Sequence, residues 1–258
     1  METMNQLYRF SNRVENYVKY RPGYPQSLVD FFDEIGICGS EKTIADIGSG
    51  TGISAKLFLD KKCIVNGIEP NKEMREAGEH FLSEYPQFKS INATAETTTL
   101  KDQSVDAIVV AQAFHWFDKE KCKIEFKRIL KKNGYVLLIW NDRVTDRTNF
   151  LKAYEQLLLD YAIDYKEVNH KNIDINKIED FFSTFKSVYK TEKLVFENYQ
   201  IFDYEGLEGR LLSSSYVPSK GHENYEHMLI ELHKIFNKYN ENGKVKFEYE
   251  TLVYALKI

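Results

Sequence analysis

Up to residue 140, two hydrophobic rhythms alternate along the chain. Short apolar runs rich in β-branched side chains recur, and between them apolar side chains fall three and four positions apart. The runs predicted as strands are 43–47, 63–69, 88–93, 105–111 and 135–140. Helices are predicted from Pro25, over 53–59 and over 118–130, and another, with Met74 on its apolar face, follows the second strand. Alternation at this spacing predicts an α/β fold, a doubly wound, mostly parallel sheet between helices.

After residue 142 the rhythm changes. Helical stripes cover 150–161 and 223–239, whereas 188–196 and 245–256 have strand-like content. The last strand is expected to pair antiparallel with its neighbour and to complete a seven-stranded sheet, with a helical insertion over the ligand edge. The predicted units are an N-terminal helical flap (1–36), a ligand-binding core (37–142), a cap insertion with one strand (143–243) and the final strand (244–258).

Composition narrows the class of protein. Of 258 residues, 43% are hydrophobic and 29% are charged, and the net charge of −4 gives no general attraction to nucleic acid. The three cysteines (Cys38, Cys63 and Cys122) are too far apart for a zinc knuckle or a disulfide framework. No stretch approaches the ~20 apolar residues of a membrane span, and the first 25 residues lack a secretory signal. These features predict a cytoplasmic protein without a nucleic-acid or membrane partner.

The strongest local signal is the glycine loop, residues 48–52 (GSGTG), between a predicted strand and a predicted helix. Glycines there permit a tight turn and let a ligand lie against bare backbone beside a helix N-terminus. A turn without a ligand would explain one or two glycines. Three alternating glycines favour a ligand site.

Two acidic residues indicate which ligand the loop holds. Asp46, just before the loop, would repel a pyrophosphate but suits an ammonium and a sulfonium. Glu69 ends the second strand at close to the ~20-residue interval expected for an acid that binds a ribose diol. Position 53 is Ile, where the dinucleotide fingerprint has Gly or Ala. The pattern therefore favours S-adenosylmethionine over NAD.

Three segments carry a family resemblance. Residues 46–52, 67–71 and 104–109 resemble successive motifs of class I S-adenosylmethionine-dependent methyltransferases, within a similarity that covers roughly 43–140. Residues 17–25 (YVKYRPGYP) and 112–118 (QAFHWFD) are similar to a small-molecule branch that includes trans-aconitate methyltransferase-like proteins. The resemblance implies a Rossmann-like fold, S-adenosylmethionine as cofactor with S-adenosylhomocysteine as product, and a small-molecule acceptor.

The resemblance also implies a set of cofactor-binding residues. These are Arg21, Asp46, Gly48, Ser49, Gly50, Gly52, Glu69, Pro70, Met74, Ala95, Glu96, Gln112 and Ala113. In it the glycine loop takes the methionine part and Glu69 takes both ribose hydroxyls. Core packing competes with adenine contact for Met74, and a solvated loop position competes with the site for Glu96.

Candidate acceptor-binding residues follow the fourth strand and lie outside the core. His115 is the candidate catalytic residue, because a histidine at this sheet edge could take a proton from a hydroxyl or orient a carboxylate; a structural role competes. Tyr20, Trp116 and Arg210 are the candidate substrate-binding residues, although Arg210 also reads as an ordinary surface arginine. No histidine pair has zinc-site spacing, so no metal is expected.

The predicted reaction asks little of side chains. A sulfonium already activates its methyl group, so the protein mainly aligns the reactants and excludes water. We expect methyl transfer to an oxygen of a small molecule, a carboxylate or a hydroxyl. The alternatives are a methyltransferase-like protein that binds the cofactor without turnover, and a nicotinamide-dependent oxidoreductase. Both Tyr-x-x-x-Lys matches, at Tyr85 and Tyr216, contain a proline that disfavours the last reading. The acceptor and the oligomeric state stay open.

Overall fold

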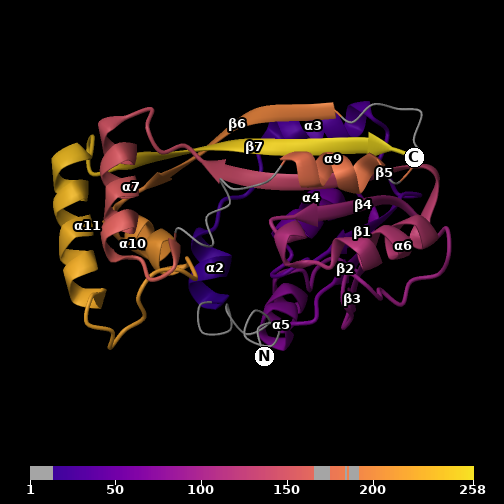
Figure 1. Cartoon of the computed structure of the whole chain (residues 1–258), viewed down its shortest axis with the longest axis horizontal. Coiled ribbons are helices and arrows are strands. Elements are labelled where there is room, and N and C mark those ends of the chain that lie inside the picture. Colours follow the sequence, from indigo (N-terminus) through magenta and orange to yellow (C-terminus); the bar gives the residue numbers. More distant parts are fainter. Residues whose placement is uncertain (1–13, 166–174, 184, 186–191) are drawn as a thin grey trace.

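A computed structural model describes residues 14–165, 175–183, 185 and 192–258. Its centre is a seven-stranded sheet in the order β3-β2-β1-β4-β5-β7-β6 (Figure 1). The strands are β1 (Thr43–Ile47), β2 (Ile64–Ile68), β3 (Phe88–Ile91), β4 (Val105–Ala111), β5 (Leu130–Arg143), β6 (Glu192–Phe202) and β7 (Val245–Lys257). The first five run parallel, and β7 is antiparallel to both of its neighbours, β5 and β6. The predicted fold class, a mostly parallel seven-stranded sheet with an antiparallel last strand, is confirmed.

Helices connect and cover the strands. They are α2 (Val14–Tyr20), α3 (Gln26–Glu34), α4 (Ile53–Asp60), α5 (Lys72–Phe81), α6 (Lys119–Ile129), α7 (Asn149–Tyr161), α9 (Ile175–Ser183), α10 (Tyr204–Leu212) and α11 (Tyr225–Tyr239). Several begin where a polar side chain accepts a hydrogen bond from a backbone N–H of the first turn. Asn71, Asp118, Thr148 and Asp203 cap α5, α6, α7 and α10 in this way.

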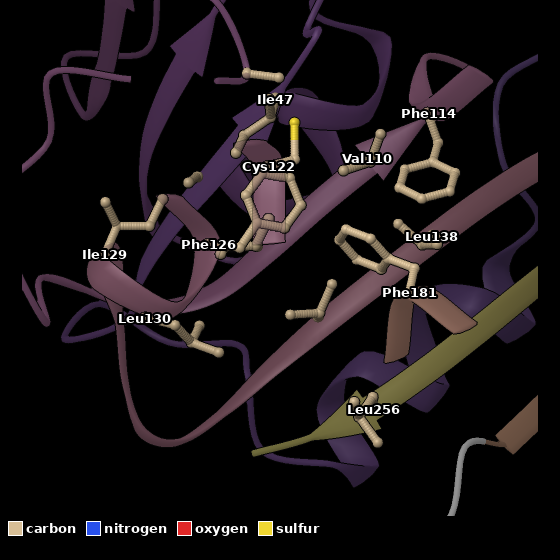
Figure 2. Packing of buried hydrophobic residues seen from close by; sticks show 14 of the residues in the cluster. Ile47, Val110, Phe114, Cys122, Phe126, Ile129, Leu130, Leu138, Phe181 and Leu256 are labelled. Carbon is tan, nitrogen blue, oxygen red and sulfur yellow. The ribbon is translucent and has the colours of Figure 1, made fainter. Parts of the chain in front are cut away.

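Both faces of the parallel strands are buried. In β4, Ile108 and Val110 face one apolar cluster while Val109 faces another, because successive strand side chains point to opposite faces. Helices α3 and α4 cover the second cluster. Figure 2 shows the first, in which Phe126 of α6 and Phe181 of α9 pack over the sheet.

A third apolar cluster lies at the far end of β6 and β7, where α7, α10 and α11 gather (Figure 1). It holds most of the described part of the predicted 143–243 insertion. Helix α9 is the exception, since it packs on the core beside α6 and not over the ligand edge.

Element boundaries differ most from the sequence expectations at β5 and β6. Strand β5 continues past residue 140 to Arg143, so three further residues reach the sheet edge. Strand β6 begins at Glu192 and ends at Phe202, whereas 188–191 of the expected strand lie outside the described residues, as do 1–13 of the expected flap. No helix in the described part of the chain is long and apolar enough to cross a membrane.

Candidate cofactor and acceptor site

The carboxyl ends of β1, β2 and β4 meet at one edge of the sheet, and this register brings Gly48, Glu69 and Gln112 together. Gly48 and Gly50 have φ of 70° and 54°, a region that glycine enters without strain. A Cβ atom on Gly48 would lie 2.6 Å from the Cβ of Ala113. The loop can therefore pass close to the end of β4 only with glycine at position 48.

Two adjoining hollows open at this edge. The acidic hollow holds about 1430 Å³ of empty space and is lined by Glu69, Met74, Glu96, His115 and Trp116, among others. The arginine chamber holds about 890 Å³ and is lined by Arg21, Arg143, Arg210, Tyr165 and Asn141, among others. Seven residues line both: Tyr17, Arg21, Gly48, Gly50, Ala111, Gln112 and Tyr216.

Glu69 joins the glycine loop to the start of α5. Its Oε2 accepts a hydrogen bond from the Gly50 N–H at 2.9 Å, and its Oε1 accepts one from the Asn71 N–H at 2.8 Å. Burial, with only 9% of the residue exposed, raises the pKa of the Glu69 carboxyl, although these two N–H groups oppose the shift. The result is an acceptor with a fixed orientation on the wall of the acidic hollow.

Asp46 lies beneath the loop, fully buried in the middle of the sheet. Burial raises the pKa of its carboxyl to about 7, and the nearby Glu69 adds to the shift, whereas the Ser54 hydroxyl, which donates to Oδ2 at 2.8 Å, opposes it. Asp46 itself lines neither hollow. Ser54, whose hydroxyl donates to Asp46, lines the arginine chamber and connects Asp46 to it.

The turn after β4 carries unusual backbone. Gln112 has φ of 62°, an uncommon value for a residue other than glycine, and its N–H donates to the Ile139 carbonyl at 2.9 Å. The following 3₁₀ turn, Phe114–Trp116, buries Phe114 and places the rings of His115 and Trp116 4.4 Å apart on the acidic hollow.

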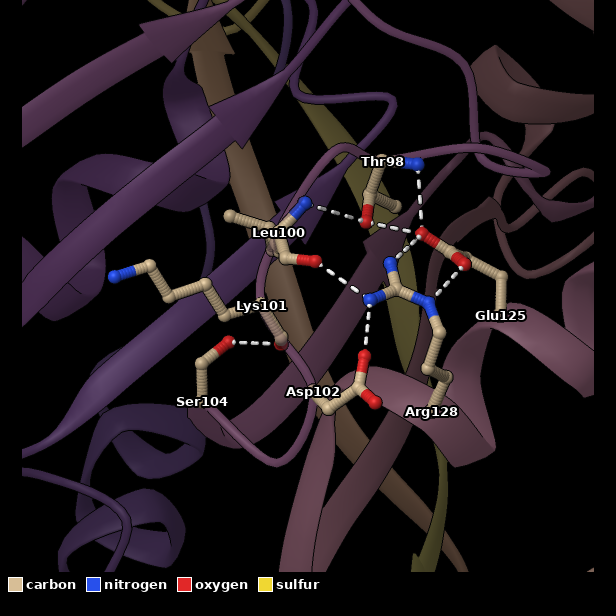
Figure 3. A network of polar contacts seen from close by, with 7 residues as sticks. All are labelled: Thr98, Leu100, Lys101, Asp102, Ser104, Glu125 and Arg128. Carbon is tan, nitrogen blue, oxygen red and sulfur yellow. Dashed lines mark hydrogen bonds and ion pairs between the residues drawn. The ribbon is translucent and has the colours of Figure 1, made fainter.

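A polar network fixes the segment that carries Ala95 and Glu96. Both the N–H and the hydroxyl of Thr98 donate to Glu125 Oε1, at 2.8 and 2.5 Å (Figure 3). Arg128 in turn pairs with Glu125 at 2.7 Å and donates to the Leu100 carbonyl at 2.7 Å. The network ties the segment to α6 and so fixes this wall of the acidic hollow. Sequence reasoning missed it, because Glu125 reads as one of many charges on α6.

Most of the residues singled out from the sequence lie on the two hollows. On the acidic hollow lie Arg21, Gly48, Gly50, Glu69, Pro70, Met74, Ala95, Glu96, Gln112, Ala113, His115 and Trp116. On the arginine chamber lie Arg21, Gly48, Ser49, Gly50, Gln112 and Arg210. Arg210 is 5% exposed, which excludes its reading as a surface arginine.

Three of those residues line neither hollow. Besides Asp46, Gly52 faces the core, where a Cβ would meet Leu82 at 2.6 Å. The Tyr20 ring packs over Gly209, and its hydroxyl donates to Glu205 at 3.1 Å, so Tyr20 holds α2 against α10. Sequence reasoning also missed Arg143, whose only signal was its place just after an expected strand end.

Comparisons with known proteins agree with this architecture. Residues 45–138 match the family model described as a methyltransferase domain. An uncharacterised methyltransferase of Mycobacterium tuberculosis is 32% identical over 134 residues, 52% of this chain, and the chain covers only about half (52%) of that relative's length. An uncharacterised methyltransferase of Schizosaccharomyces pombe is 24% identical over 247 residues, 95% of each chain.

The fold has relatives among solved structures. A candidate type II methyltransferase of Anaeromyxobacter dehalogenans superposes with a TM-score of 0.67 at 17% identity, over 92% of this chain and 98% of that one. The resemblance to the trans-aconitate-like branch stays a prediction. The family model, the strand order and the glycine loop agree, and the chain contains a class I S-adenosylmethionine-dependent methyltransferase domain.

Proposed function

We propose that the protein transfers the methyl group of S-adenosylmethionine to an oxygen of a small-molecule acceptor, a carboxylate or a hydroxyl. The observation that carries the proposal is the shared wall between the two hollows. Gly48, Gly50 and Gln112 line both, so a ligand in the acidic hollow and an acceptor in the arginine chamber would meet at the end of β4.

The residues of the acidic hollow fit the cofactor. Glu69 offers a buried carboxylate of fixed orientation for a ribose diol, and the loop at Gly48 leaves bare backbone where a Cβ would not fit. Pro70 and Met74 add apolar surface for a flat base. When bound, S-adenosylmethionine supplies a methyl group that its sulfonium has already activated.

The chain's own contribution is alignment and exclusion of water. Tyr17 and Arg21 bring the end of α2 over both hollows, and Tyr216 closes them from the cap side. A carboxylate acceptor needs no base. For a hydroxyl acceptor, His115 on the acidic hollow is the candidate to take the proton. The cytoplasmic location stays a prediction from the sequence.

Thermal unfolding with S-adenosylhomocysteine, S-adenosylmethionine and NADH added separately tests the cofactor. A ligand at a hundredfold its dissociation constant adds about 2.7 kcal/mol, or roughly 5–10 °C for a chain of this size. We expect the shift with either adenosyl ligand and none with NADH. Transfer of labelled methyl from S-adenosylmethionine to a panel of carboxylic acids and alcohols then tests turnover.

Variants of two glutamates at α5 locate the site. Glu69→Gln puts an amide in place of a buried carboxylate that two N–H groups orient, so S-adenosylhomocysteine should bind about 10- to 150-fold more weakly, the equivalent of a charged hydrogen bond. The matched control is Glu76→Gln on the exposed face of α5, where the residue only pairs with Lys72 at 3.7 Å. Equal affinities for the two variants, or a shift with NADH alone, would refute the cofactor assignment. Adenosyl binding without turnover on any acceptor would favour the non-catalytic alternative.

A further inference from the structure

Three arginines from three separate segments converge on the arginine chamber. Arg21 follows α2, Arg143 is the last residue of β5, and Arg210 lies in α10. Ser213 links two of them, because its carbonyl accepts from Arg21 Nη2 at 3.0 Å while its hydroxyl lies 3.5 Å from Arg210 Nη1. The guanidinium groups of Arg21 and Arg210 are therefore held close together at the junction of cap and core, on the chamber that Arg143 also lines.

The chamber has more positive than negative charge. Among the described residues, Arg143 alone of the three has an ion-pair partner, Glu155. Arg210 has neutral partners, the Tyr249 hydroxyl at 2.9 Å and the Ser214 hydroxyl at 3.1 Å. Of the described residues that line the chamber, Asp142 is the single acid. Since a guanidinium cannot lose its proton to relieve burial, this excess charge is costly without a counter-ion.

Two neighbouring groups report the same excess. Burial lowers the pKa of Arg21, and repulsion from Arg210 lowers it further. Burial raises the pKa of the Tyr216 phenol, but Arg143, Arg210 and Arg21 together bring it below its ordinary value. The field inside the chamber therefore favours a negative group.

Hydrogen-bond donors are also left over. Arg21 Nε and Arg143 Nη1 are buried and have no hydrogen-bond partner in the described structure. Buried N–H groups are nearly always paired, so two unpaired donors on the lining of one chamber indicate a missing acceptor.

We propose that the arginine chamber binds an oxyanion group of the methyl acceptor, a carboxylate or a phosphate, against Arg143 and Arg210 and next to Arg21, which also lines the acidic hollow. Such a group supplies the missing negative charge and accepts from the unpaired donors, and planar guanidinium forks match its geometry. The inference rests on the proposed function, which it deepens: the acceptors are small acids and not neutral alcohols.

Calorimetry on the full chain, loaded with S-adenosylhomocysteine, tests anion binding in the arginine chamber with three probes: succinate, inorganic phosphate and the uncharged succinamide. We expect succinate or phosphate to bind and succinamide to bind at least tenfold more weakly. The comparison of succinate with phosphate identifies which oxyanion the chamber prefers. Equal binding of all three probes, or binding of none, overturns the proposal.

Substitutions at Arg210 locate the binding. Arg210→Met should weaken anion binding at least tenfold while S-adenosylhomocysteine affinity changes less than twofold, because Arg210 does not line the acidic hollow. Arg210→Lys keeps the charge without the fork, provides a folded comparison, and should lose less. The control Arg147→Met removes an arginine that pairs with Glu248 and Glu250 outside the chamber, and should bind anions as the parent does.

The two hypotheses fail separately. If S-adenosylhomocysteine binds but both Arg210 variants bind the anion as tightly as the parent, the arginine chamber is not the anion-binding site. The proposed function then stands without it. If the anion binds through Arg210 but no adenosyl ligand binds, the anion-binding site is supported and the proposed function is refuted.

Discussion

Asp46 illustrates how position changes the chemistry of one side chain. In the sequence it is an acid beside a glycine loop, free to face a ligand. In the structure it sits in the central strand β1, paired with Gly67 on one side and Val109 on the other, with no exposed surface. Its influence on the site therefore passes through the Ser54 hydroxyl and through its repulsion of Glu69.

The raised pKa of Asp46 has a consequence for stability. Because the folded value of about 7 lies above the unfolded value of about 4, the folded chain keeps a proton that the unfolded chain loses between these pH values. The free energy of unfolding should fall as pH rises from 5 to 7, by at most about 1.4 kcal/mol per pH unit from this group, and level off above 7. Urea unfolding of the ligand-free protein at pH 5, 6, 7 and 8 measures it.

Asp46→Asn is the comparison for that series, since an amide oxygen can still accept from Ser54. The variant should lack the contribution of Asp46 to the pH dependence. Between pH 5 and 7, the free energy of unfolding should therefore fall more for the parent than for Asp46→Asn. Parallel curves for the two proteins would show that Asp46 does not titrate in this window. Glu69 is present in both proteins, and burial is the largest cause of its raised pKa, so most of its contribution is common to the two curves.

The sequence was sufficient to predict which residues lie at the ligand edge of the sheet. Gly48, Glu69 and Gln112 follow strand ends, and strand ends can be found from hydrophobic pattern alone. It did not reveal which charges are buried. Arg143 pairs with Glu155, and Arg210 donates a hydrogen bond to the Tyr249 hydroxyl. Both partners lie on other elements, more than ten residues away in the sequence, and no local pattern encodes such contacts.

Among the elements, α2 has the largest effect on the site for its size. Its Lys19 and Tyr20 both reach Glu205 of α10, and it also contacts α5 of the core. Tyr17 of this helix and Arg21, which directly follows it, line both hollows. The position of α2 over the edge therefore depends on how closely it can approach α10.

Gly209 of α10 sets that approach, because a Cβ there would lie 2.0 Å from the Tyr20 ring. Gly209→Ala should displace α2 at a cost of about 1–3 kcal/mol, which appears as a roughly 5- to 150-fold weaker affinity for S-adenosylhomocysteine in calorimetry. The matched control is Gly23→Ala, two residues beyond Arg21, where an added Cβ meets no atom within 4 Å. If both alanine variants bind the ligand equally well, α2 is not required at its observed place.

Element prediction succeeded where one period dominates. The strands and helices of the core alternate clearly, and α7 and α11 show long apolar stripes. Helix α10 went unpredicted because Gly206 and Gly209 are poor helix formers. Its packing needs both, since a Cβ on Gly209 would meet the Tyr20 ring of α2 and a Cβ on Gly206 would meet Phe202. The place of α9 was also beyond the sequence, since an apolar stripe says that a helix packs but not on which surface.

The whole molecule is held together by its longest strands. The first part of β7 packs in the cap cluster through Val245, Phe247 and Tyr249, whereas its last part packs in the core through Val253 and Leu256. Strand β5 pairs with β7 from Tyr135 to Arg143, so the sheet runs without a break from core to cap. Cap and core should therefore unfold together.

Phe247→Ala tests this cooperativity, because Phe247 is fully buried in the cap cluster with the Tyr154 ring 4.8 Å away. The loss should be about 3–5 kcal/mol, and it should shift the unfolding of the entire chain to lower temperature. Far-UV circular dichroism reports both parts, and fluorescence of Trp140 in a Trp116→Phe background reports the core, where Trp140 is 1% exposed. The control Tyr199→Ala removes an exposed ring of the neighbouring strand and should cost less than about 0.5 kcal/mol. If the Trp140 fluorescence keeps the midpoint of the parent while the dichroism falls in two steps, cap and core unfold independently. The arginine chamber between them would then depend on how two separate units dock.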